Sequence, residues 1–171
     1  MSERIRHIVL GTMTIVILGV ANWQIVGKEN IVQQGATILL QLAPVDPRSL
    51  MQGDYMALRY RMTTEIDRAA REAGISDGVV VVHLDESGIA EFVALYQGGK
   101  LEPGQALLKF RKRGDSVRIA SDAFFFEEGR FEMYRRAGFG EIRVDDNGNA
   151  VLTGLRDQEV QPLGAPLHQI N

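Results

Sequence analysis

The segment from Ala43 to Tyr60, APVDPRSLMQGDYMALRY, holds the densest group of side chains capable of chemistry. Carboxylates, guanidinium groups and phenols follow one another within a few residues: Asp46, Arg48, Asp54, Tyr55, Arg59 and Tyr60. Pro47 fixes its own φ and Gly53 permits a positive φ, so we expect a rigid loop before the next strand. Such a loop can hold Asp54 beside Arg48 in a charge-assisted pair. The segment fits three interpretations: a turn that satisfies its own backbone donors, a binding surface, or a catalytic site.

The concrete catalytic hypothesis is a dyad of Ser49 and Lys109. A serine hydroxyl becomes a nucleophile when a neighbouring base accepts its proton, and a lysine amine can be that base. Lysine is scarce beyond residue 27, and Lys109 lies on a predicted strand from which it can point inward. The hypothesis requires the Ser49 oxygen within hydrogen-bond reach of the amine.

A second candidate segment begins with Phe124-Phe125-Phe126 and continues to Arg143. In the helix predicted over Glu127–Ala137, Glu128 and Glu132 have i,i+4 spacing and share one face. Two carboxylates on one face can bind a cation or an arginine, and an acidic helix start that complements the helix dipole explains them equally. A cation site needs more oxygen ligands than two, so a sensor hypothesis adds Asp54 to this pair.

The composition excludes several classes of protein. The 171 residues are 45% hydrophobic and 24% charged, which is typical of a folded chain rather than a disordered one. The net charge is -3, and no basic run suits nucleic acid, so no nucleic-acid partner is expected. Cysteine is absent, which removes disulfides and thiol chemistry. The three histidines are far apart, and we predict neither a cofactor nor a metal.

The stretch Ile8–Val26 carries no formal charge and is long enough to cross a bilayer as a helix. Arg4 and Arg6 precede it, and the positive-inside tendency places the amino end in the cytoplasm. We therefore expect residues 1–27 to anchor the chain in lipid through residues 8–26. Residues 28–171 then form one periplasmic domain on the inner membrane. The alternative is a cleavable signal peptide whose small residues are Gly19 and Ala21.

The remaining pattern predicts an α+β fold, in which the N-terminal transmembrane helix is followed by a mostly antiparallel β-rich domain with two short helices. In the strand over Asp54–Arg61, period two places Met56, Leu58 and Tyr60 toward the core and Tyr55 and Arg59 on the other face. A helix capped by Thr63 or Thr64 is expected to end at Gly74, with Ile66, Ala69, Ala70 and Ala73 facing inward. The other predicted strands cover residues 35–43, 78–85, 89–96, 106–112, 116–120, 139–144 and 150–155. Hairpins are predicted across Glu86-Ser87-Gly88 and Arg113-Gly114-Asp115, and a turn at Asp146-Asn147-Gly148. The tail after Gln158 is expected to be extended and poorly ordered.

The stretch Gly53–Tyr60, GDYMALRY, resembles the signature of the GDYXXLXY family of bacterial membrane-anchored proteins of unknown function. The resemblance extends upstream through Asp46, Pro47 and Arg48. It also covers a later block with matching residues at Glu128, Gly129, Glu132, Tyr134 and Arg143. It implies one amino-terminal anchor and association with a polytopic membrane protein, and it supplies no reaction.

A fainter resemblance, to type I signal peptidases, rests on a proline-bearing loop followed by Gly-Asp and a strand. The serine nucleophile of those enzymes corresponds in position to Val45, while Ser49 lies four residues before Gly53. The sequence therefore favours a non-enzymatic binding or accessory domain with Tyr55 and Arg59 as contacts. A peptidase-like hydrolase and a ligand or cation sensor remain the alternatives.

Overall fold

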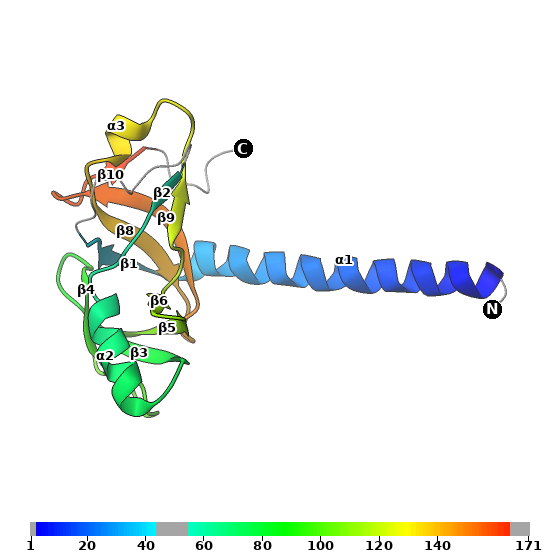
Figure 1. Ribbon diagram of the computed structural model, residues 1–171, viewed down its shortest axis with the longest axis horizontal. Coiled ribbons are helices and arrows are strands. Elements are labelled where there is room, and N and C mark those ends of the chain that lie inside the picture. Colours follow the sequence, from blue (N-terminus) through cyan, green and yellow to red (C-terminus); the bar gives the residue numbers. More distant parts are fainter. Residues whose placement is uncertain (1–2, 44–54, 165–171) are drawn as a thin grey trace.

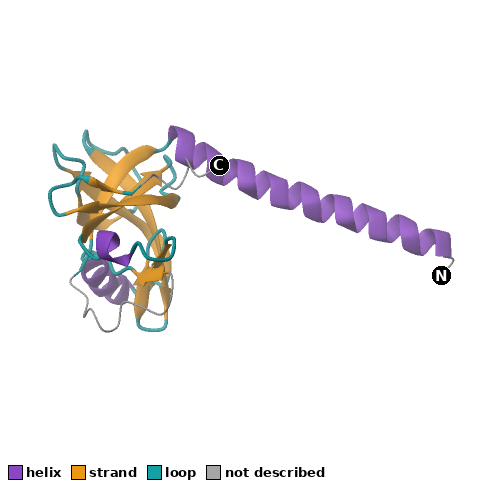
Figure 2. Ribbon diagram, turned by 90° about the horizontal axis from the view of Figure 1, so that it is seen from above, coloured by secondary structure: helices purple, strands orange, loops and turns teal. Residues whose placement is uncertain are grey.

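A computed structural model describes residues 3–43 and 55–164 of the chain. Its first element, α1 (Glu3–Gln34), projects away from the body, and its amino end lies far from it (Figure 1). The stretch Val9–Gln34 contains an 18-residue window with a mean hydropathy of 1.8, and none of that window is buried. Figure 2 shows the helix clear of the strands except at its carboxyl end. The described chain thus has one helix long and apolar enough to cross a membrane.

The helix runs eight residues beyond the predicted apolar stretch, from Gly27 to Gln34. The residues that follow Gly27 are mostly good helix formers, and Gln33 donates a 3.1 Å hydrogen bond to Glu29 one turn earlier. Gly35 ends the helix, its N–H donating to the Ile31 carbonyl at 2.9 Å. A polar helical segment therefore separates the apolar part of α1 from the first strand.

Two four-stranded antiparallel sheets and a two-stranded ribbon form the body. The first sheet has the order β1 (Ala36–Gln41), β8 (Ala137–Val144), β9 (Ala150–Asp157) and β10 (Pro162–Leu163). The second has the order β4 (Ala90–Leu95), β3 (Asp77–Leu84), β5 (Gln105–Arg113) and β6 (Ser116–Arg118). The ribbon pairs β2 (Tyr55–Ala57) with β7 (Ala123–Phe125). Helix α2 (Thr63–Ala73) packs against β4 and β6, and α3 (Phe131–Tyr134) follows β7.

Aspartates fix three of the hairpin turns in the same way. The Asp85 carboxylate accepts the N–H groups of Ser87 and Ile89 at 2.8 and 2.9 Å, and Asp145 and Asp157 accept the equivalent pairs in their own turns. These carboxylates accept hydrogen bonds from backbone N–H groups that have no backbone carbonyl partner where the chain reverses. The predicted hairpins at residues 86–88 and 146–148 are confirmed, whereas the third, which leads into β10, was not predicted.

One contiguous core receives side chains from both sheets, the ribbon and α2. Ile38, Ile66, Val80 and Ile142 are among its fully buried members, one from each of four elements. Each such side chain contributes about 1.5–3 kcal/mol relative to an exposed position. The two sheets are also joined directly, since the Leu39 N–H donates to the Gly88 carbonyl at 2.9 Å. The architecture confirms the predicted apolar helix followed by antiparallel sheets and two short helices.

The helix predicted over Glu127–Ala137 is wrong in extent. Only Phe131–Tyr134 is helical, because Gly129 turns the chain at φ 83° and Ala137 already begins β8. Strand β7 was missed, although its alternation is clear: Phe124 is buried and Phe125 is 69% exposed. The tail was also misjudged as far as Gly164, because Leu163 lies in β10 and is buried.

The amino end of α2 differs from the predicted threonine cap. Met62 occupies the cap position and makes no side-chain cap hydrogen bond, while the Thr63 hydroxyl donates to the Tyr60 carbonyl at 2.6 Å. Gly74 ends the helix in the left-handed conformation at φ 68°, as expected. Ile66 and Ala70 are buried as predicted, but Ala73 is exposed.

Candidate functional site

The β2–β7 ribbon joins the two segments that the sequence marks as candidates. Tyr55, Met56 and Ala57 pair in register with Phe125, Phe124 and Ala123. The rings of Tyr55 and Phe125 lie 5.6 Å apart on the outer side, whereas Met56 and Phe124 are buried. The described part of the motif, residues 55–60, and the phenylalanine block are therefore parts of one site.

The predicted alternation along the motif is confirmed. Met56, Leu58 and Tyr60 are each at most 5% exposed, while Tyr55 is half-buried and Arg59 is exposed. Only Tyr55–Ala57 forms ladder hydrogen bonds as a strand; beyond it the Leu58 N–H donates to the Asp122 carbonyl at 2.8 Å. Burial raises the pKa of the Tyr60 phenol well above its usual value, and the nearby Asp122 carboxylate adds to this effect.

Aromatic rings anchor the second block beneath the ribbon. The Tyr134 ring lies 5.0 Å from that of Phe124 and 5.2 Å from that of Phe126, and Tyr134 is buried. Such tilted ring pairs each contribute about 0.5–1.5 kcal/mol beyond their burial. Tyr134 is therefore a packing residue that holds α3 against β7.

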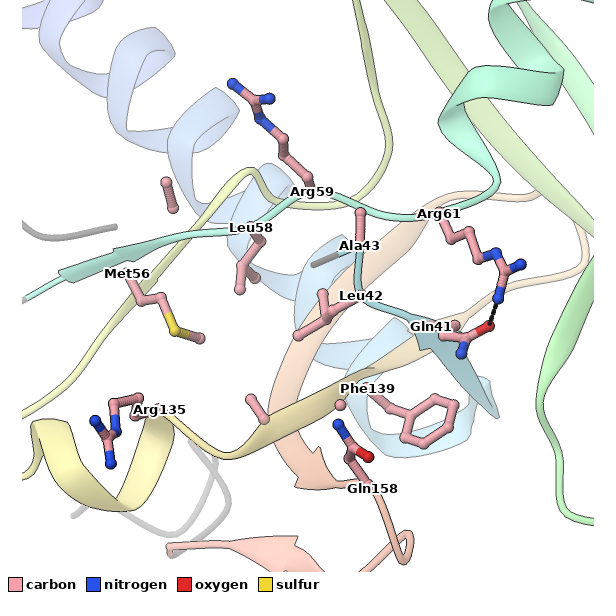
Figure 3. Close-up of a pocket in the computed structure, with 13 residues that line it drawn as sticks. Gln41, Leu42, Ala43, Met56, Leu58, Arg59, Arg61, Arg135, Phe139 and Gln158 are labelled. Carbon is pink, nitrogen blue, oxygen red and sulfur yellow. Dashed lines mark hydrogen bonds between the residues drawn. The ribbon is translucent and has the colours of Figure 1, made fainter. Parts of the chain in front are cut away.

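A pocket of about 680 Å³ opens beside the motif, between β2, the end of β1 and the start of β8. Figure 3 shows Arg59 and Arg61 on one side of it and Arg135 with Gln158 on the other. Leu42 and Leu58 supply an apolar floor between them. The lining residues in the described chain include three arginines and no carboxylate.

The three guanidinium groups are only partly engaged. Arg61 donates to the Gln41 side-chain oxygen at 3.4 Å, and Arg135 lies 3.4 Å from the exposed carboxylate of Glu132. Within the described part of the chain, no ion pair or hydrogen bond occupies the Arg59 side chain. Arginine pairs with carboxylates in a bidentate geometry. The pocket can therefore bind a carboxylate or phosphate group beside an apolar contact.

Six predicted site residues lie outside the described residues: Asp46, Pro47, Arg48, Ser49, Gly53 and Asp54. Both members of the expected Asp54–Arg48 pair are therefore outside the described residues. So is the Ser49 member of the Ser49–Lys109 dyad. Lys109 itself is described, and it does not point inward. Its side chain is exposed on β5 and its ammonium group donates to Asn149 at 2.8 Å.

The acidic pair of the second block does not have the expected geometry. Glu128 lies in the turn before α3, so it does not share a helical face with Glu132. Gly129 forms that turn, and Glu132 pairs with Arg135. Among residues 3–43 and 55–164, no three His, Cys, Asp or Glu side chains converge to hold a metal ion. The cation-sensor hypothesis gains no support from these residues.

Arg143 joins the sheet to the end of α1. Its guanidinium donates a 2.8 Å hydrogen bond to the Gly35 carbonyl, at the joint between α1 and β1. A motif residue of the second block thus fixes the end of the apolar helix against the body.

The sequence missed Arg61, Gln41 and Gln158 as pocket residues. A signal for Arg61 was present, because period two after Arg59 places both arginines on the face opposite Leu58 and Tyr60. No sequence signal connects Gln41 or Gln158 with the motif, since only the tertiary fold brings β1 and the turn after β9 beside it.

The family model described as GDYXXLXY protein matches residues 17–155. No curated protein matches the chain, and no solved structure does either. The match begins within α1 and ends in β9, so it contains both the motif strand and the aromatic block that pairs with it. The chain belongs to the GDYXXLXY family.

Proposed function

We propose that the protein is a single-pass membrane-anchored binding protein whose extracytoplasmic domain binds an acidic segment of a polytopic membrane protein. The anchor is the apolar part of α1, with the amino end in the cytoplasm and the body in the periplasm of a bacterial envelope. The uniformly exposed apolar surface of this helix supports that role, since water does not stabilise such a surface.

The binding site in this proposal is the motif surface, defined as Tyr55, Arg59, Arg61, Phe125 and Arg135. The observation that carries it is the pairing of β2 with β7, which places an exposed phenylalanine beside a tyrosine. Outside α1, Phe125 is the most exposed large apolar side chain in the described chain. Exposed aromatic residues next to arginines are the composition typical of interface hot spots. The three arginines make an acidic partner segment the best electrostatic match.

The test is co-purification of the full-length protein from detergent extracts of the native membrane. The variant Tyr55→Ala/Arg59→Ala is expected to lose its polytopic partner, because it removes one aromatic contact and the one pocket guanidinium, that of Arg59, without an ion pair or hydrogen bond in the described chain. Val93→Ala/Arg68→Ala is the matched control, since both of its residues are exposed on other elements. Retention of every membrane partner by the first variant would contradict this assignment of the surface.

Topology is tested separately. A reporter active only outside the cytoplasm, fused after Asn171, is expected to be active. Activity of a reporter that functions only in the cytoplasm, fused at the same position, would contradict the proposed orientation.

A further inference from the structure

A second cavity lies where α1 meets the body. It is an open cleft of about 990 Å³ between the last turns of α1 and strands β3, β5 and β9. Gln24, Gly27, Lys28 and Ile31 form its helical wall. The cleft is distinct from the motif surface, with which it shares no residue.

The depth of this cleft follows from the length of the apolar stretch. If Ile8–Val26 fills the hydrocarbon layer, the residues after Val26 emerge into the lipid headgroups within the next turns. Gly27, Lys28 and Ile31 of the helical wall therefore lie at headgroup level, and Gln24 lies at the edge of the hydrocarbon layer. The body lies beyond this end of α1, and its face toward the helix is the face nearest the bilayer (Figure 1).

The charge of the cleft is opposite to that of the domain. Residues 28–171 carry 17 Lys and Arg against 21 Asp and Glu, a net charge of −4. The first 27 residues hold the remaining charged side chains, Glu3, Arg4 and Arg6. The cleft is nevertheless lined by five cationic residues and three aspartates. Its cations are Lys28, Lys109, Arg111, Arg113 and Arg118. An acidic domain thus presents a local positive excess at the bilayer.

Internal pairing accounts for some of these charges and leaves others free. Arg111 pairs with Asp77 and Arg118 with Asp122, each at 3.1 Å. The third aspartate, Asp145, accepts three hydrogen bonds within its own turn.

Three cations remain without a carboxylate at pairing distance. Lys28 and Arg113 are exposed and make no ion pair with any described residue, and Lys109 bonds only to the neutral Asn149 amide. These three are the positive groups available to a ligand, although Lys109 also interacts electrostatically with the Asp145 carboxylate.

We infer that this cleft binds the phosphate headgroup of an anionic phospholipid in the leaflet next to the body, where the carboxyl end of α1 leaves the bilayer. Lys28 approaches the headgroup from the helix, and Lys109 and Arg113 approach it from β5. Cationic side chains near an anionic bilayer surface each strengthen attachment, and two elements that grip one headgroup fix the body against the membrane. The inference rests on the membrane anchoring of the proposed function.

The chain carries its own reporter for this site. Trp23 is the only tryptophan, it is 79% exposed, and it lies one helical turn before Gly27 on the same face. The full-length protein is reconstituted into vesicles of phosphatidylcholine and phosphatidylglycerol, with one of the two lipids brominated in each series. Bromine quenches Trp23 fluorescence when that lipid occupies the neighbouring site, so the two series give the preference of the site.

The wild-type protein is expected to prefer phosphatidylglycerol by at least about fivefold, a preference that falls at high salt. Lys28→Gln/Lys109→Gln/Arg113→Gln is expected to lose it, and Lys28→Arg/Lys109→Arg/Arg113→Lys to keep it. Arg68→Gln/Lys100→Gln/Arg136→Gln removes equal charge from residues that do not line the cleft, and it is expected to retain the wild-type preference.

Three outcomes would overturn the inference: no preference in the wild type, an undiminished preference in the cleft variant, or loss of the preference in excess inorganic phosphate at constant ionic strength. The last would assign the cleft to a free anion instead of a lipid. Flotation of the vesicles separates this failure from that of the proposed function. A protein that does not float with lipid contradicts the anchor and the inference together, whereas a floating protein without preference contradicts only the inference.

Discussion

The guanidinium of Arg143 donates a 2.8 Å hydrogen bond to the backbone carbonyl of Gly35, 108 residues earlier in the chain. Gly35 lies between the end of α1 and the start of β1, and a Cβ atom there would approach the Ile31 carbonyl oxygen and the Val144 backbone more closely than side chains allow. The joint therefore combines a close backbone approach with a charged hydrogen bond. It fixes the direction in which the helix leaves the body.

Gly35→Ala is expected to lower the free energy of unfolding by about 2 kcal/mol, because the new methyl group forces the backbone of Ile31 and Val144 apart. Gly27→Ala is the control: it lies within α1 with open space around its Cα, so it is expected to be neutral or stabilising. Urea unfolding of the full chain in detergent, followed by near-ultraviolet circular dichroism, measures both. Equal stability of the two variants would contradict the close approach at Gly35.

Tyr60→Phe is expected to destabilise the protein by about 1–2 kcal/mol, because it leaves the Ser121 carbonyl without its partner. The Tyr60 phenol is buried and donates to that carbonyl at 2.8 Å. Tyr96→Phe removes a hydrogen bond of the same length, to the Gly99 carbonyl, where water can replace the lost donor. We expect this control to change the free energy of unfolding, measured in the same way, by less than about 0.5 kcal/mol. A loss as large in the control as at Tyr60 would argue against a special role for burial.

Arg156→Ala is expected to cost about 1–3 kcal/mol, more than an exposed ion pair contributes. Arg156 lies 2.6 Å from Glu141, both side chains are less than 30% exposed, and it also donates to the Val160 carbonyl at 2.9 Å. Arg118→Ala breaks the pair with Asp122, in which both side chains are more than half exposed. In thermal unfolding, the Tm of Arg156→Ala should be well below that of Arg118→Ala. The reverse order would contradict a larger contribution from the Arg156 ion pair.

Acid is expected to weaken the contact between α2 and β5 through Asp67. Hydrogen bonds from Lys112 and then Arg71 lower the pKa of this carboxyl below its ordinary value of 3.8. A folded-state pKa lower than the unfolded one stabilises the protein above the unfolded pKa, and this contribution disappears as the pH falls through the folded pKa.

Stability should therefore decrease as the pH falls below about 4, and Asp67→Asn should flatten this part of the curve. Lys112→Met should also flatten it, because it removes the largest cause of the lowered pKa. Urea unfolding at a series of pH values measures the slope. An Asp67→Asn variant with the wild-type slope would show that other groups control the acid response.

The sequence alone determined the features that depend on local periodicity. The uncharged run Ile8–Val26 specified a helix apolar on every side, because no polar face interrupts it. The two-residue period of a strand specified that Met56, Leu58 and Tyr60 face the core, since successive strand residues point to opposite sides. The Asp and Gly residues at the turns specified hairpins for the same local reason. The motif itself specified the family.

Only the tertiary structure decided how these pieces combine. The pairing of Tyr55 with Phe125, the gathering of Arg59, Arg61 and Arg135, and the bond from Arg143 to Gly35 join residues far apart in the chain. No local preference specifies such contacts, because strand partners are chosen by how the whole core closes. The short α3 shows the same effect. Its residues suit a longer helix by composition, but the pairing of β8 with β1 and β9 takes Ala137 and the residues after it into a sheet.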